Sequence, residues 1–168
     1  MPFTPYHFGP SACIALPLNR WIDLPVFLLA NVALDIEPLL VMTLNLSYPL
    51  HGYAHTLLGA TLIGLGWGGI AYAFRRPLTD LMTKVFRLSS APTIKRMLIS
   101  GVLGTWLHVA LDAPLYRDIR PFWPLSANPL LGTIGSDALY AFCAWSFIPA
   151  LVIYAVMVIR TRDSERDT

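Results

Sequence analysis

The few residues of this chain that could bind a cation or move a proton lie in or beside apolar segments. His108 and Asp112, in the run HVALD, are four residues apart, so both side chains would point from one face of a helix. Such a pair can hold one divalent cation, or its members can hydrogen-bond to each other. Ionisable groups in lipid are costly, so they normally pair, face a cavity or bind an ion.

A second pair with the same spacing, His51 and His55, begins another apolar segment. His55 is the stronger candidate ligand, because Pro49 and Gly52 indicate a loop or a frayed helical turn around His51. An imidazole exposed to lipid headgroups is the alternative for His51. His51 is therefore kept only as a possible additional ligand.

An acidic pair, Asp35 and Glu37, lies in the run LDIEP. Residues two apart diverge on a regular helix, but Pro38 disfavours helical geometry at Glu37 and can turn that carboxylate inward. One acid can then serve as a ligand and the other as a base. His7 precedes a short apolar run and would by itself be typical of a surface histidine; the other pairs make it a candidate for a first or second metal site.

Composition indicates a membrane protein. Hydrophobic residues make up 55% of the 168 residues and charged residues only 13%, whereas soluble domains carry roughly a quarter charged residues. The net charge of +2, without a basic stripe, excludes nucleic acid as a partner. We therefore expect residues 1–168 to form a single integral-membrane helical domain whose main partner is the lipid bilayer.

Hydropathy predicts the helices that must position these residues. Segments 55–74 and 138–159 run for about 20 residues without Asp, Glu, Lys or Arg and are plain spans. Segments 22–44 and 97–116 are spans with polar insertions, and 8–18 is a shorter apolar run bounded by prolines. The predicted fold is all-α: a polytopic membrane bundle of about five helices, four clear spans plus a short N-terminal helix. GxxxG pairs in 55–74 and glycines in 97–116 favour close helix packing.

The distribution of Lys and Arg predicts the orientation. The connection at about 75–96 is basic and reads as a cytoplasmic loop, and the arginines after residue 159 agree. The N-terminus then lies outside and the C-terminus in the cytoplasm. Arg117 and Arg120, which fall on the outer side, are weak evidence against this orientation. In this topology the His and acid pairs all reach the external leaflet. The outer connection could hold a lipid phosphate through Arg117 and Arg120, although an ordinary aromatic belt with Arg anchors explains it as well.

Together, His7, LDIEP, HGYAHT and HVALD resemble the bacterial and archaeal family of membrane-bound metal-dependent hydrolases, often called YdjM-like. The resemblance covers most of the chain, and its implied ligands are His7, Asp35 with Glu37, His55, and His108 with Asp112. The chain departs from the family pattern at Gly52, where an Arg is usual, and at Thr56, where a Ser is usual. The order of elements is less closely similar to the zinc-dependent phospholipase C fold. The resemblance implies an enzyme in the inner (plasma) membrane of a prokaryote.

Imidazoles and carboxylates without thiolates suit zinc or a similar divalent ion. We expect one or two ions held by His7, Asp35, His55, His108 and Asp112, with Glu37 as the catalytic base for a metal-activated water. A site at the membrane surface favours a phospholipid or another lipid-linked ester or phosphoester as substrate. Two alternatives stay open: a divalent-metal transporter, and a structural membrane protein whose polar residues hydrogen-bond between helices.

Overall fold

The computed structural model describes residues 4–88 and 92–166, with side chains to residue 161. All regular secondary structure in this part of the chain is helical, and none of the described residues forms a strand. Its elements are η1 (Thr4–His7), α1 (Phe8–Ala15), α2 (Leu24–Leu34), α3 (Ile36–Thr43), η2 (Tyr53–His55), α4 (Leu57–Ala73), α5 (Arg75–Lys84), α6 (Ile94–Asp112), α7 (Ser136–Trp145) and α8 (Phe147–Arg166).

Prolines explain where three of these helices break. A proline has no N–H for the carbonyl four residues earlier, and its ring crowds that carbonyl. Residues four before Pro38, Pro77 and Pro149 are the last residues of α2, α4 and α7, respectively: Leu34, Ala73 and Trp145. Each break is followed at once by another helix, and α4 and α5 meet at a bend of 77°.

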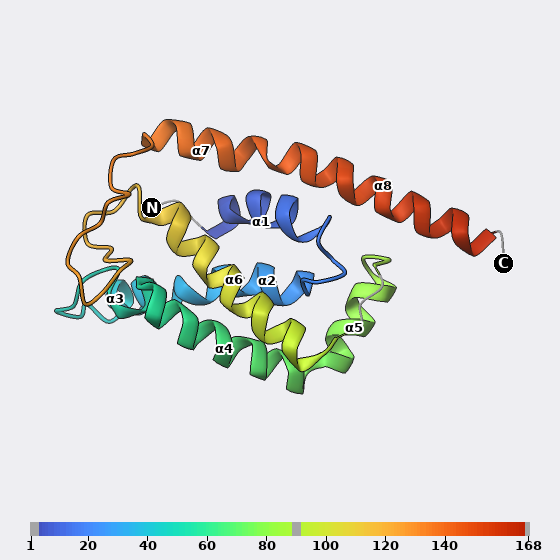
Figure 1. The fold of residues 1–168 in the computed structure, drawn as a ribbon, viewed down its shortest axis with the longest axis horizontal. Coiled ribbons are helices and arrows are strands. Elements are labelled where there is room, and N and C mark those ends of the chain that lie inside the picture. Colours follow the sequence, from blue (N-terminus) through green and yellow to red (C-terminus); the bar gives the residue numbers. More distant parts are fainter. Residues whose placement is uncertain (1–3, 89–91, 167–168) are drawn as a thin grey trace.

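Successive helical passes run in alternating directions along the long axis, so that α2 and α6 lead toward the end where α3 and the α6–α7 connection lie (Figure 1). Helix α6 packs on both α4 and α2, and its buried face carries His108 and Asp112. This arrangement brings the C-terminal end of α6 beside the start of α4. The residues predicted to do chemistry thus gather at one end of the bundle.

Helices α4 and α6 approach closely because glycine faces backbone on both sides. A Cβ on Gly64 would lie 2.7 Å from the carbonyl oxygen of Gly101, too close for any real side chain. The Thr105 hydroxyl donates across the same interface to the Ala60 carbonyl oxygen at 2.8 Å. The expected close packing through small residues is confirmed, and it holds α6 in place relative to the residues that precede α4.

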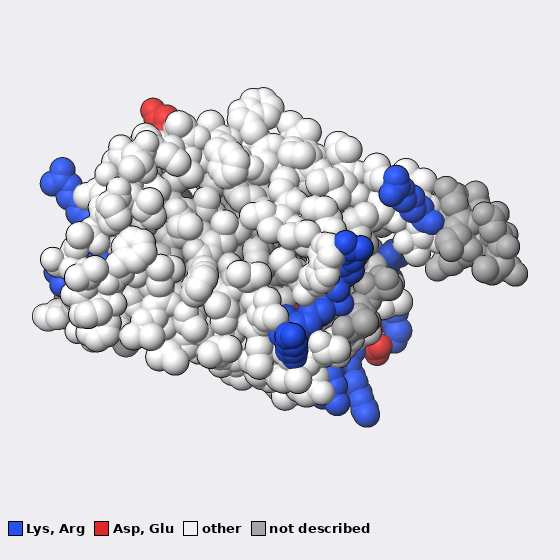
Figure 2. Space-filling view, in the orientation of Figure 1, with Lys and Arg blue, Asp and Glu red and all other residues white. Residues whose placement is uncertain are grey.

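The surface suits a lipid environment. Large apolar side chains are exposed along the outer helices, for example Trp145 at 69% and Leu151 at 63% on α7 and α8. Lys and Arg gather toward the ends of the molecule, with an uncharged surface between them (Figure 2). Isolated apolar side chains are normal on soluble proteins, but an extended uncharged band marks a membrane or partner contact.

Two described helical segments are long and apolar enough to cross a membrane: Leu24–Thr43, which joins α2 to α3, and Ser136–Thr161, which joins α7 to α8. The pair α4 and α5 is a third candidate if the 77° bend between them lies within one span. The structure therefore supports a helical bundle with membrane spans but not the predicted five spans. Helix α1 has eight residues, about 12 Å of rise against a hydrocarbon core of about 30 Å, and the charged and polar residues of α6 lower its hydropathy.

The predicted basic loop at 75–96 is partly helical. It contains α5, which turns away from α4, and the first residues of α6. Hydropathy missed α5 because its apolar residues lie on one face of the helix and its charged residues on the other, so the sequence shows no continuous apolar run.

Candidate metal centre

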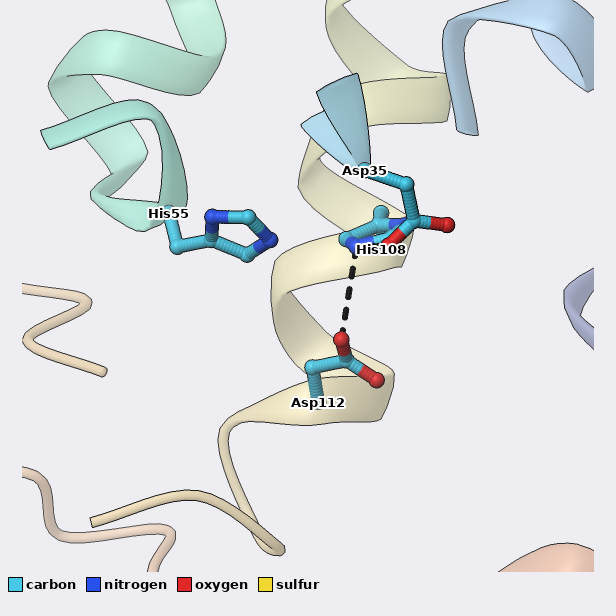
Figure 3. A group of neighbouring side chains, drawn as sticks. All are labelled: Asp35, His55, His108 and Asp112. Carbon is cyan, nitrogen blue, oxygen red and sulfur yellow. Dashed lines mark ion pairs between the residues drawn. The ribbon is translucent and has the colours of Figure 1, made fainter. Parts of the chain in front are cut away.

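Four side chains from three elements meet where α2 ends, α4 begins and α6 ends. Asp35 lies at the α2–α3 break, His55 closes η2 just before α4, and His108 and Asp112 lie one turn apart on α6. Each of the four offers one ligand atom, and all four atoms lie within 4.8 Å of one another. Figure 3 shows the four side chains pointing toward a common region.

The spacing within this group fits a tetrahedral ion. Ligand atoms held about 2.0–2.2 Å from a tetrahedral metal lie about 3.3–3.6 Å from one another. The His108 Nε2 atom is 3.3 Å from Asp112 Oδ2 and 3.6 Å from Asp35 Oδ1. The widest separation, 4.8 Å, would close by about 1 Å around such an ion.

Buried atoms without hydrogen-bond partners provide the strongest evidence of fit. Within the described residues, His55 Nε2, His108 Nε2 and Asp112 Oδ1 are buried and make no hydrogen bond. His55 and His108 are fully buried and Asp112 is 2% exposed, so bulk water does not reach them. A buried polar atom left unsatisfied costs about 1–3 kcal/mol, and a bound cation would satisfy the two ring nitrogens.

Asp35 forms the open side of the group. Its side chain keeps 25% of its surface exposed, whereas the other three residues are closed in. A ligand atom or a substrate would therefore approach the centre past Asp35.

Glu37 contacts the centre through His55 rather than directly. Its Oε2 atom accepts hydrogen bonds from His55 Nδ1 at 2.8 Å and from the Gly52 N–H at 2.9 Å, and its Oε1 atom accepts one from the Ala54 N–H at 3.2 Å. This carboxylate fixes the tautomer of His55 and leaves Nε2 directed at the group, the usual outer partner of a metal-binding histidine. The predicted role of Glu37 as catalytic base stays a prediction, and its contacts favour positioning.

His7 lies against the far side of the same residues. Its Nε2 atom is 3.3 Å from Asp112 Oδ1, and its Nδ1 atom is 3.2 Å from Nδ1 of His108. A metal on His108 Nε2 would leave Nδ1 of His108 protonated and able to donate to His7. His7 would then carry its own proton on Nε2, facing Asp112. In this arrangement His7 would hydrogen-bond to His108 and Asp112 without contacting the ion. Its predicted role as a metal ligand stays a prediction.

A short chain of buried polar residues holds His7 in place. The Ser11 hydroxyl donates to the His7 carbonyl oxygen at 2.7 Å, and the Asn31 side-chain amide donates to the Ser11 hydroxyl at 2.8 Å. Both Ser11 and Asn31 are fully buried. Sequence reasoning missed them, although Asn31 is a rare polar residue within the apolar segment 22–44.

The His51 ring meets the His55 ring edge to face, but His51 pairs with another residue. Its ring centroid lies 4.8 Å from that of His55, and its Nδ1 atom lies 3.0 Å from Asp118 Oδ1. Burial raises the pKa of the Asp118 carboxyl, but hydrogen bonds from the backbone and ring N–H of His51 outweigh it and hold the pKa below its usual range. His51 thus stands outside the four-residue group, and Asp118, which sequence reasoning missed, fixes its orientation.

A pocket opens next to His51. Its volume is about 200 Å³, and it is lined by Tyr48, Pro49, His51, Gly52, Tyr53, Thr56, Asp118, Arg120 and Trp123. Arg120 is thus at a place where a substrate could bind, whereas Arg117 is exposed and is not among the lining residues.

The fold and the site together define a class: a helical bundle with apolar spans and a His/Asp cluster that could hold a metal ion. Comparison of the chain with protein-family models, with curated proteins and with solved structures gave no match.

Proposed function

We propose that this chain is a membrane-embedded, metal-dependent hydrolase with zinc or a similar divalent ion at Asp35, His55, His108 and Asp112. The observation that carries the proposal is the set of buried, unsatisfied ligand atoms on His55, His108 and Asp112. With Asp35 they come from three elements, and one ligand atom of each residue lies within 4.8 Å of the others. His108 Nε2 and Asp112 Oδ1 each lie 3.3 Å from a possible partner, Asp112 Oδ2 and His7 Nε2 respectively. Hydrogen bonding between helices alone gives no reason for His55 Nε2 to be buried without a partner.

Held by His55, His108 and Asp112, a divalent ion would keep one tetrahedral position for a water and would lower the pKa of that water, so that it can attack an ester or phosphoester at neutral pH. Around it, the protein's own residues would perform distinct tasks. Asp35, on the open side, can accept a proton from the attacking water, while Glu37 holds the ring of His55. Arg120, beside the pocket, can bind an anionic group of the substrate.

Amphipathic substrates are favoured by the position of the pocket. Tyr53 and Trp123 line it, and their rings stack edge to face at 5.4 Å between centroids. Such aromatic residues suit the depth of lipid headgroups, and an arginine beside them suits a phosphate. We propose a phospholipid or another lipid-linked ester or phosphoester as the substrate, and likeness to the YdjM-like hydrolases in the motifs agrees with this class.

The proposed setting is the inner membrane of a prokaryote. With the basic end of the bundle in the cytoplasm, the N-terminus and the metal centre lie at the external surface and the C-terminus inside. In this setting α1 and α6 would complete a set of five passes, with α1 dipping into the bilayer and polar α6 shielded by α2 and α4.

Metal analysis tests the proposal. Protein purified in detergent should retain about one equivalent or more of a divalent ion, and His108→Ala and Asp112→Ala should lose it while keeping the helical circular dichroism of wild type. Thr161→Ala, on the exposed end of α8, serves as the control. A metal-free wild type that also fails to take up zinc would end the proposal. Loaded protein should next be assayed against phosphoester lipids in mixed micelles.

A further inference from the structure

A second binding site is indicated at the opposite end of the bundle, where a groove lies between the α1–α2 connection and the start of α6. Its lining residues are Leu18, Arg20, Trp21, Ile22, Thr93, Lys95, Arg96, Ile99 and Leu103. Three of them are basic and none is acidic. Its charged end at Lys95 lies 13 residues before His108 on α6, about 20 Å of helix rise, so the metal centre does not account for it.

The groove changes in character along α6. Lys95, Ile99 and Leu103 are spaced four residues apart, so they form one stripe on the helix. The stripe covers eight residues, about 12 Å of helix rise. Ile99 is 42% exposed and Leu103 is 38% exposed. A charged end therefore leads into an open apolar track directed toward the middle of the bundle.

The opposite wall repeats this pattern. Leu18 and Trp21 are exposed at 36% and 55%, and the guanidinium carbon of Arg20 lies 3.5 Å from the centroid of the Trp21 ring. Stacking on an aromatic face holds a guanidinium while its N–H groups stay able to donate. Arg20 is thus held in place among the residues that line the groove, and Lys95 lies on the opposite wall.

Arg96 has a different task. Its Nη2 atom donates to the carbonyl oxygens of Asn19 and Ile22, the latter at 2.8 Å. These bonds fasten the α1–α2 connection to α6 and so build the groove. Exposed Arg20 and Lys95 are the cations that face a ligand.

We infer that this groove binds an anionic phospholipid, with the headgroup phosphate at Arg20 and Lys95 and one acyl chain along Ile99 and Leu103. The charge complementarity selects an anion, and the apolar track selects one that carries a hydrocarbon chain. A soluble anion would use only the basic end. The inference is independent of the proposed hydrolase activity.

Titration with brominated lipids tests it. Brominated acyl chains quench nearby tryptophan fluorescence, so detergent-purified full-length protein is titrated with brominated phosphatidylglycerol and with brominated phosphatidylcholine. We expect saturable quenching at lower concentration for phosphatidylglycerol, with a component that disappears in Trp21→Phe. Because each basic residue near a membrane surface is worth about fivefold in binding to anionic lipid, Lys95→Gln should raise the half-saturating concentration about fivefold and Arg20→Gln with Lys95→Gln about 25-fold.

The control removes two charges from the same end without touching the groove. Arg76→Gln with Lys84→Gln, both exposed on α5, should shift the titration less than twofold. An equal shift for both double variants would overturn the inference in favour of general attraction between charges. Equal affinity for the two lipids, or displacement of phosphatidylglycerol by an equal concentration of inorganic phosphate, would also overturn it.

Discussion

The contacts of Glu37 predict how its replacement by glutamine would act. Two donors, His55 Nδ1–H and the Gly52 N–H, converge on Oε2, and the Ala54 N–H donates to Oε1. A glutamine has one acceptor oxygen and one NH2 group, so in either orientation an NH2 faces an N–H. Glu37→Gln keeps the shape of the side chain but loses at least one of these bonds and the negative charge behind His55.

The expected cost is that of an outer-shell partner, about 10–100-fold in metal affinity, or about 1.4–2.7 kcal/mol. Zinc affinity would be measured in detergent by competition with a chromophoric chelator. Asp137→Asn is the matched control, because Asp137 is an exposed carboxylate in the first turn of α7; it should bind zinc as wild type does. Hydrolysis should fall only as far as zinc occupancy falls.

The two roles considered for Glu37 give different results. If Glu37→Gln bound zinc with wild-type affinity, the positioning role would be refuted. If hydrolysis were also lost at full occupancy, Glu37 would act as the base that its place in LDIEP suggests. Circular dichroism and thermal unfolding of the variant would confirm that the η2 segment has not simply unfolded.

Three further predictions concern the packing of α4 on α6, the helix break at Pro38 and the effect of pH. Gly101→Ala, whose Cβ would meet the Gly64 backbone, should lower the free energy of unfolding by about 1–3 kcal/mol and weaken zinc binding. Gly66→Ala, with open space around it, should change neither, and equal thermal unfolding of the two variants would contradict the close approach of α4 and α6. Pro38→Ala should restore a hydrogen bond to the Leu34 carbonyl oxygen and join α2 and α3 into one helix. Stability should then hold or rise while zinc affinity falls. Wild-type zinc affinity in this variant would contradict a role for the break. Zinc affinity should fall as the pH drops, because the two imidazoles must be deprotonated to bind metal, and a flat profile between pH 7 and 5 would argue against histidine ligands.

Much of the site could be predicted because a short interval between two residues on a helix fixes whether their side chains share a face. A four-residue interval on a helix places His108 and Asp112 on one face, and alternating passes bring the ends of 22–44, 55–74 and 97–116 together. Four of the five predicted ligands, Asp35, His55, His108 and Asp112, lie together. That they and His7 bind a metal stays a prediction.

The remaining contacts could not be predicted because they depend on distant segments. The His51–Asp118 pair joins residues 67 positions apart, and the Asn31–Ser11 bond joins α2 to α1. No local pattern fixes such partners. The helix breaks could have been predicted from the sequence, since each lies four residues before a proline. A hydropathy average runs across such a break, so it predicts one continuous span.

The break at Asp35 shows how an apolar helical segment can carry a candidate metal ligand. Irregular backbone in a bilayer is tolerated only where its polar groups find partners. Here the Asp35 N–H donates to the Val32 carbonyl oxygen at 3.1 Å, and the Leu39 N–H donates to the Asp35 carbonyl oxygen at 3.1 Å. The backbone N–H and carbonyl groups of Asp35 therefore both keep a hydrogen-bond partner at the break.

Pro149 provides a comparison that tests whether a helix break affects the metal centre only when it lies beside the clustered residues. It breaks the α7–α8 segment in the same way, with Ser146 donating its N–H to the Phe142 carbonyl oxygen at 3.0 Å, but none of the four clustered residues lies on that segment. Pro149→Ala should therefore stabilise the protein as Pro38→Ala does while leaving zinc affinity unchanged. If both variants weakened zinc binding equally, a helix break would affect the packing of the whole bundle. The proposed local link between Pro38 and the position of Asp35 would then be wrong.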